Sequence, residues 1–255
     1  MISQMAISLS LGQWLGLTWL IAFALFLMLA PTSTTEGASR DEGSAMMPVI
    51  FIRFFYWLTT PLVWVFGRLN IGPNQITIAS LVFALGAGWS LARGEFTAGF
   101  WLFIAAIALD LIDGVAARTQ DAQSDRGAFL DSWIDRAVEA AVLGGLAIYG
   151  RDTWLLEVSL WALIASFLIS YARGRAQALG VDCKEGLMQR PERMFILATT
   201  IFIAPLVAMW VEPTATTPTY HAAIIGIGAL ALLSTATAIR RVWVTMHRLQ
   251  ESQPA

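Results

Sequence analysis

Apolar runs that are long enough to cross a lipid bilayer recur along this chain, and only short polar stretches separate them. A transmembrane helix needs roughly 20 predominantly apolar residues. The bilayer interior also requires each spanning segment to pair its own backbone groups, which a helix does. With 57% hydrophobic and 13% charged residues, the composition is typical of a multi-span membrane protein and excludes an ordinary soluble domain. The expected fold class is all-α, a polytopic membrane helical bundle with six core transmembrane helices, at about 76–92, 96–117, 128–149, 154–176, 194–211 and 222–246.

Two further segments precede this core. Residues 8–30 are apolar, and no Lys or Arg stands before them, which argues against a secretory signal with a basic start. We therefore expect residues 1–45 to be an extra N-terminal apolar segment with its linker; the alternative is a start site placed too early, ahead of Met46 or Met47. Residues 46–72 are rich in aromatic side chains and predict an amphipathic helix at the membrane interface, with a spanning helix as the alternative. The core domain then covers 73–250, and 251–255 form a tail.

Four aspartates lie where two of the apolar runs meet. Asp110 and Asp113 are three residues apart, and Asp131 and Asp135 are four apart, so on helices each pair shares one face. Each carboxylate at membrane depth costs roughly 2.5–3.5 kcal/mol to insert, and bound cations would offset that cost. Hard oxygen ligands favour Mg²⁺, Mn²⁺ or Ca²⁺. The alternative is that these polar side chains only hold neighbouring transmembrane helices together.

The residues around these aspartates resemble a known family of membrane enzymes. Every fixed position of the CDP-alcohol phosphotransferase pattern, D-x2-D-G-x2-A-R-x8-G-x3-D-x3-D, is matched here, by Asp110, Asp113, Gly114, Ala117, Arg118, Gly127, Asp131 and Asp135. The resemblance covers about residues 54–248. It implies an enzyme that joins an alcohol to the β-phosphorus of a CDP-linked lipid and expels CMP. It also implies Mg²⁺ or Mn²⁺ as the cofactor, as two ions, and a homodimer.

The resemblance implies a role for each of these residues. Asp110, Asp113 and Asp131 are expected to bind the metal. Asp135 is expected to act as the general base for the acceptor hydroxyl and also to share a metal ion. Contacts with the CDP-lipid are expected from Asn74, Gln75, Ile76, Thr77, Gly114, Ala117, Arg118, Ser124 and Gly127. Two of these residues have a structural alternative, because Asn74 can cap a helix and Ala117 can serve tight helix packing.

Arginines cluster at the ends of two later apolar runs. Arg173 and Arg175 lie in the sequence S-Y-A-R-G-R-A, and Arg190 and Arg193 lie in R-P-E-R. Both sequences are similar to those of the phosphatidylinositol-phosphate synthase branch, where basic residues at these places hold the phosphate of inositol 1-phosphate. The expected acceptor is therefore inositol 1-phosphate, with glycerol 3-phosphate as the alternative. Gln177 stands where that branch has an acid, and contact with lipid phosphates would also explain arginines here.

Basic residues are unevenly distributed between the two sets of loops. Arg93 and Arg151 fall on one side of the predicted bundle. The other side receives Arg118, Arg126, Arg173, Arg175, Lys184, Arg190, Arg193, Arg240, Arg241 and Arg248. By the positive-inside rule the larger set faces the cytoplasm. We therefore expect a multi-pass protein of the inner membrane, with an active site that opens to the cytoplasm and takes CDP-diacylglycerol and a phosphorylated polyol, and no nucleic acid.

A cation or proton transporter is the non-enzyme alternative, because acids inside a membrane also line ion pathways. The acids here cluster near one membrane face, and no inverted repeat is visible, which disfavours that class. An inactive scaffold is disfavoured because all the motif residues are present. The single cysteine, Cys183, excludes a disulfide framework within the chain.

Overall fold

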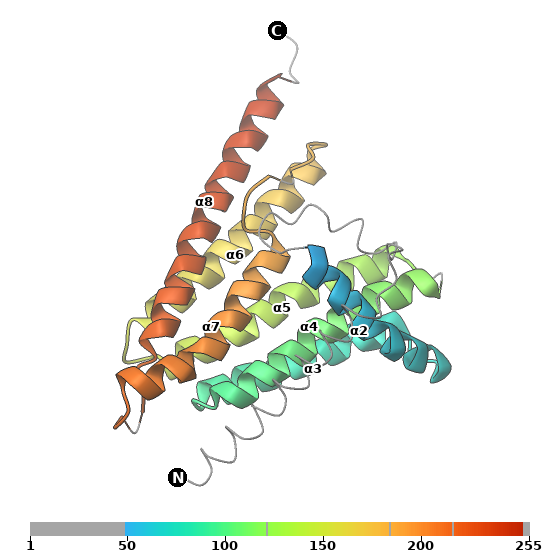
Figure 1. Cartoon of the computed structure of the whole chain (residues 1–255). Coiled ribbons are helices and arrows are strands. Elements are labelled where there is room, and N and C mark those ends of the chain that lie inside the picture. Colours follow the sequence, from blue (N-terminus) through green and yellow to red (C-terminus); the bar gives the residue numbers. More distant parts are fainter. Residues whose placement is uncertain (1–48, 121, 184, 216, 252–255) are drawn as a thin grey trace. The chain divides into compact units, whose positions relative to one another are not determined.

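The computed structural model describes residues 49–120, 122–183, 185–215 and 217–251, with side chains except at 49–56 and 58. The expected N-terminal apolar segment, 1–45, and residues 252–255 of the tail lie outside these ranges. Over the described part of the chain the structure is helical throughout (Figure 1), which confirms the predicted fold class. The helices are α2 (Val49–Arg68), α3 (Pro73–Ala92), α4 (Phe96–Thr119), α5 (Asp125–Tyr149), α6 (Leu155–Ala178), α7 (Arg190–Val211) and α8 (His221–Glu251).

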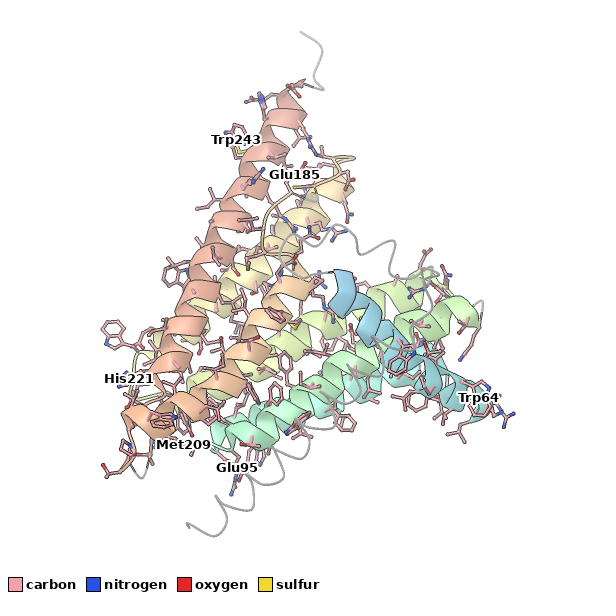
Figure 2. The ribbon with its side chains drawn as sticks, in the orientation of Figure 1. Trp64, Glu95, Glu185, Met209, His221 and Trp243 are labelled. Carbon is pink, nitrogen blue, oxygen red and sulfur yellow. The ribbon has the colours of Figure 1, made fainter. Side chains whose placement is uncertain are left out.

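Five of these helices are long and apolar enough to cross a membrane, namely α3, α4, α6, α7 and α8. Helix α5 is also long, at 25 residues, but it carries too many charged side chains to be counted with them by hydropathy. The chain is thus a multi-pass membrane protein in which α5 carries more charged side chains than the five apolar helices allow. Helix α2 has 20 residues with Pro61 inside it, and the Arg68 guanidinium carbon lies 4.0 Å from the ring centre of the exposed Trp64 (Figure 2).

By its contacts the chain divides into two compact units. Among the described residues, the first contains α2, the beginning of α3 up to Ser80, α4 from Ala105 onwards, and the first turns of α5 up to Ser132. Its core is made by buried apolar side chains from α2, α3 and α4, which are Val63, Ile76, Ile112 and Ala116. This core fixes the first turn of α3 against α4, the helix that carries the first pair of aspartates.

The start of α3 has a defined cap. Pro73 occupies the first helical position, where its missing N–H costs nothing. Gln75 reaches back so that its Oε1 accepts a hydrogen bond from the Gly72 backbone N–H at 3.0 Å, as in a capping box. The cap of α3 is therefore built from Gly72 and Gln75, so the predicted structural alternative for Asn74, as the capping residue itself, is wrong.

The second unit contains residues 81–104 and everything described after 132. Here α3 and α5 approach so closely that a Cβ on Gly88 would overlap the Ala141 carbonyl oxygen, and one on Gly145 would overlap the Gly88 carbonyl oxygen. Small residues allow this approach of two backbones, as is usual where membrane helices cross. Helix α8 runs beside α6 and α7 (Figure 1). Pro205 lies inside α7, which continues to Val211.

Hydrogen bonds join the connection between α6 and α7 to α8. Thr237 Oγ1 accepts a hydrogen bond from the Met188 backbone N–H at 3.2 Å. The buried Arg241 donates from Nε to the Glu185 carbonyl at 2.9 Å and from Nη1 to the Ile169 carbonyl at 3.1 Å. Arg248 contacts the side chain of Glu185, which is labelled in Figure 2. These contacts hold the segment that leads into the R-P-E-R sequence at the start of α7.

Candidate metal and substrate site

Three of the four predicted acidic ligands meet in the first unit. Asp110 and Asp113 come from α4 and Asp131 comes from α5, and one carboxylate oxygen of each lies within 4.8 Å of the others. Asp113 is buried, with 5% of its surface exposed, whereas Asp110 and Asp131 are half-buried. The three-residue spacing on α4 places two carboxylates on one helical face, and the hairpin of α4 and α5 adds the third.

This arrangement fits a divalent cation. Negative charges that converge at this distance repel one another, and a bound cation offsets that repulsion. Three hard oxygen donors with no sulfur or imidazole among them suit Mg²⁺ or Mn²⁺ better than a soft metal. The donor set therefore agrees with the cofactor expected from the sequence.

A cavity of about 230 Å³ adjoins this cluster within the same unit. Asp113 and Asp131 contribute to its wall. Seven of the nine residues predicted to contact a CDP-lipid also line it: Asn74, Thr77, Gly114, Ala117, Arg118, Ser124 and Gly127. Sequence reasoning missed Pro73, Ala122, Gln123 and Ala128, which complete the lining and lie within two positions of predicted residues in the chain. One concave surface thus combines the acidic cluster, a cationic side chain and small residues.

The other two residues predicted to contact the CDP-lipid, Gln75 and Ile76, do not line this cavity. The Gln75 side chain caps α3, as described above. Ile76 is 2% exposed and packs in the core between α2, α3 and α4. Both follow from helical geometry, because side chains at successive positions point in different directions and only Asn74 and Thr77 share the face that reaches the cavity.

Gly127 allows two polar side chains to approach the start of α5. A Cβ at this position would lie 3.2 Å from Ser124 Oγ and 3.3 Å from Asn74 Oδ1. Ser124 Oγ accepts a hydrogen bond from the Gly127 backbone N–H at 3.1 Å, which makes Ser124 the N-cap of α5. The hydroxyl therefore has a structural role in the cap and also faces the cavity.

The fourth predicted ligand, Asp135, has a cationic neighbour. It lies on α5, one turn after Asp131, and its Oδ1 is 2.5 Å from Nη2 of Arg190 at the start of α7. The Asp135 side chain is 14% exposed and that of Arg190 is 34% exposed. Both residues belong to the second unit, so the predicted general base and one predicted acceptor arginine form an ion pair.

The other predicted acceptor arginines are in two different environments. Arg173 and Arg175 are exposed on the last turns of α6. Arg193 is buried, and its guanidinium makes a bidentate pair with Glu139, with Nε–Oε1 at 2.9 Å and Nη2–Oε2 at 3.1 Å. The guanidinium that was expected to bind a phosphate therefore has a carboxylate partner inside the protein. Sequence reasoning missed Glu139, although it stands four residues after Asp135 and so on the same helical face.

Comparisons with known proteins identify the family of this chain. Residues 70–245 match the family model described as CDP-alcohol phosphatidyltransferase. The archaetidylinositol phosphate synthase of Pyrococcus horikoshii is 36% identical over 186 residues, which cover 72% of this chain and 88% of that protein. The phosphatidylinositol phosphate synthase of Mycobacteroides abscessus is 34% identical over 199 residues, covering 70% and 89%.

Solved structures of a similar protein also superpose on this chain. The phosphatidylinositol phosphate synthase of Mycobacterium tuberculosis with CDP-DAG bound matches with a TM-score of 0.64 and 28% identity, over 73% of this chain and 92% of that one. The same enzyme in complex with manganese and citrate matches with a TM-score of 0.63 and 26% identity, over 74% and 88%. These relatives are thus named archaetidylinositol phosphate synthase or phosphatidylinositol phosphate synthase, and one of the solved structures has CDP-DAG bound.

Proposed function

Because the chain belongs to the CDP-alcohol phosphatidyltransferase family, we propose that it transfers a phosphatidyl group from CDP-diacylglycerol, or from an archaeal-type CDP-lipid, to a hydroxyl of a phosphorylated polyol and releases CMP. The acceptor that we propose is inositol 1-phosphate. The observation that carries this proposal is the convergence of Asp110, Asp113 and Asp131 beside a cavity lined by the other motif residues.

The acidic cluster is the proposed metal site. Asp110, Asp113 and Asp131 would hold Mg²⁺ or Mn²⁺, as two ions, with Asp135 as a further ligand; the manganese complex of the mycobacterial relative supports this choice of metal. When bound, such ions neutralise charge on a diphosphate and polarise its phosphorus. The protein's own contribution is to bring three carboxylates from two helices to one place and to leave one side of the cluster open to the cavity.

The cavity is the proposed site for the CDP group. Gly114, Ala117 and Gly127 provide a wall without bulk, so a nucleotide can lie close to the helix backbone. Arg118 supplies a guanidinium, which can make bidentate contacts with diphosphate oxygens. Asn74, Thr77 and Ser124 add polar atoms to the lining. The relative crystallised with CDP-DAG supports this assignment.

Asp135 is the proposed general base. A carboxylate one turn beyond the metal ligand Asp131 on the same helix can accept the proton of an acceptor hydroxyl while that oxygen attacks the β-phosphorus in line with the departing CMP. Arg173, Arg175 and Arg190 are the proposed ligands of the acceptor phosphate, because guanidinium groups bind phosphate oxygens bidentately. The relatives that are named inositol phosphate synthases support a phosphorylated inositol as the acceptor.

The proposed setting is the inner membrane, with the protein as a homodimer. The uneven distribution of Lys and Arg between the two sets of loops along the sequence supports a cytoplasmic orientation for the loops that carry the larger set. CDP-linked substrates are cytoplasmic, so the two expectations agree.

An acceptor panel tests the proposed function. Purified protein in lipid nanodiscs is incubated with CDP-diacylglycerol, Mg²⁺ and labelled inositol 1-phosphate, glycerol 3-phosphate, inositol or serine, and lipid products are separated by chromatography. We expect labelled lipid with inositol 1-phosphate, and at least about a 100-fold loss in Asp135→Asn. If only glycerol 3-phosphate gives a lipid product, it is the acceptor in place of inositol 1-phosphate. If none of the alcohols gives a lipid product, the proposed function is contradicted.

A further inference from the structure

Two ion pairs join α5 to α7, and they differ in exposure. Arg190 pairs with Asp135 near the surface of the second unit, and Arg193 pairs with Glu139 in its interior. We infer that the inner pair is fixed and the outer pair is exchangeable: Arg190 holds Asp135 while the acceptor is absent, and the phosphate of the acceptor competes with Asp135 for Arg190. This inference rests on the proposed function, because it assigns a control step to the same site.

The inner pair is held on several sides. Both side chains are almost fully buried, with 5% of Arg193 and 3% of Glu139 exposed. Besides the bidentate contact with Glu139, Arg193 donates from Nη1 to the Met188 carbonyl at 3.2 Å. Removing either partner from a buried pair leaves an uncompensated charge, which is strongly unfavourable. Arg193 therefore acts as a positioning residue that fixes the first turn of α7, and it is not available to a solute anion.

The arginine of the outer pair is partly accessible from solvent, whereas Asp135 is more enclosed, with 14% of its side chain exposed. With 34% of its side chain exposed, Arg190 can be reached by a small anion, and the first turn of α7 keeps its place through Arg193. A phosphate carries more negative charge than a carboxylate and offers more acceptor oxygens to a guanidinium. A phosphorylated acceptor can therefore displace Asp135 from Arg190 without any movement of the helices.

The exchange has a consequence for side reactions. While Arg190 occupies Oδ1, that oxygen is unavailable as a proton acceptor. Water could otherwise replace the alcohol: its oxygen would bond to the β-phosphorus, the bond from that phosphorus to the CMP oxygen would break, and the proton would pass to Asp135, leaving phosphatidic acid and CMP. If the phosphate of the acceptor releases Asp135, the base becomes available only when an alcohol is bound. Hydrolysis of the donor is then suppressed while the acceptor is absent.

Competition for Arg190 is tested by a binding cycle. The affinity of the full-length protein for inorganic phosphate is measured for the wild type, Asp135→Asn, Arg190→Gln and the double variant. We expect Asp135→Asn to bind phosphate at least about 5-fold more tightly than the wild type, and we expect no gain when Arg190→Gln is already present. An equal gain in both backgrounds would show a general charge effect and would overturn the exchange, as would the absence of any gain.

Hydrolysis of the donor gives a second, independent measurement. CMP release from CDP-diacylglycerol without an acceptor should rise several-fold in Arg190→Gln, and inorganic phosphate should raise it in the wild type. If Arg190 only binds the acceptor, its replacement raises the acceptor KM and leaves this hydrolysis unchanged, which would overturn the exchange. Arg190→Lys serves as the conservative variant if Arg190→Gln does not fold, with an intermediate rise expected. A wild type that makes lipid product but shows neither effect would contradict the exchange alone, and the proposed function would stand.

Discussion

Arg190 and Arg193 stand three residues apart in one short motif, and their neighbours give them different capacities. Arg190 is partly exposed beside Asp135, and Arg193 is enclosed with Glu139 and the Met188 carbonyl. The aspartates differ in the same way, since Asp113 is buried in a cluster of carboxylates while Asp135 lies against a guanidinium. At the scale of a residue, chemical role follows from the environment as much as from residue type.

The acidic cluster predicts a strong effect of neutralising one member. Asp113→Asn removes a charge from the most buried ligand, so we expect turnover to fall by at least about 100-fold and binding of Mn²⁺, followed by its paramagnetic signal, to weaken. The control is Asp152→Asn, because Asp152 is 86% exposed and lies outside the cluster. Unchanged Mn²⁺ binding in Asp113→Asn would count against the assignment of this site.

Gly127 predicts an effect on the CDP-lipid. A methyl group there would press on Ser124 Oγ and Asn74 Oδ1, so these cavity-lining groups must shift by a few tenths of an ångström. We expect Gly127→Ala to raise the KM for the CDP-lipid several-fold with a smaller change in kcat. Gly144→Ala is the matched control on the same helix, because a Cβ at Gly144 meets nothing within 4 Å. Equal kinetics for the two variants would remove Gly127 from the proposed donor site.

At the scale of the helix, α5 combines two tasks. One face carries Asp131, Asp135 and Glu139 at helical spacing, and the side chains on this face make the contacts described above. Another part of the helix packs against the backbone of α3 through Gly145. A polar helix in a membrane protein needs this kind of close packing, because its charged face cannot be placed against lipid.

The crossing of α3 and α5 predicts the cost of a single methyl group. Gly145→Ala would overlap the Gly88 carbonyl, which is backbone and cannot turn aside. We expect it to lower the stability by about 1–3 kcal/mol, as overpacking does in other cores, and to lower the unfolding temperature in nanodiscs. Gly144→Ala, at the adjacent position, should leave that temperature unchanged or raise it. An unchanged unfolding temperature in Gly145→Ala would show that α3 and α5 can move apart to make room for the methyl group.

At the scale of the whole molecule, the second unit has its charged pairs and its aromatic cluster in different places. Phe96, Tyr149 and Tyr220 come from the start of α4, the end of α5 and the residue before α8, and the Phe96 and Tyr220 ring centroids are 4.0 Å apart. Tyr149 donates its hydroxyl to the Pro218 carbonyl at 2.6 Å. Tyr220 keeps a left-handed φ of 53°, which a bulky side chain adopts only when its neighbours hold it there.

This aromatic cluster predicts how stability responds to alkaline pH. Burial, followed by the nearby charges of Tyr149 and Glu212, raises the pKa of Tyr220 to about 12 from 10.0. Because the raised pKa favours the protonated phenol in the folded state, Tyr220 contributes to the free energy of unfolding. This contribution is complete below pH 10 and is lost as the pH rises towards 12. We expect the unfolding temperature to fall by a few degrees between pH 9 and 11.

Replacing the phenol tests this explanation. Tyr220→Phe keeps the ring and removes the ionisable hydroxyl, so its unfolding temperature should fall less over the same pH range. Tyr171→Phe is the control, because Tyr171 is 69% exposed. An alkaline loss of the same size in Tyr220→Phe as in the wild type would assign the loss to another group.

The sequence alone determined the helices, the membrane class and the spacing of the motif residues along each helix. These features depend on local geometry: apolar run length decides what crosses a bilayer, and the helical repeat decides which residues share a face. It also placed most of the cavity lining, because Gly114, Ala117 and Gly127 belong to one uninterrupted pattern.

Only the tertiary structure decided which charged groups pair. Arg193 and Glu139 are 54 residues apart in the chain, and their contact depends on how α5 and α7 are rotated and placed against each other. The same packing gave Asp135 an arginine neighbour, and the core contacts of Ile76 turned that side chain away from the cavity. Such choices depend on the summed packing of many side chains, which no local pattern in the sequence records.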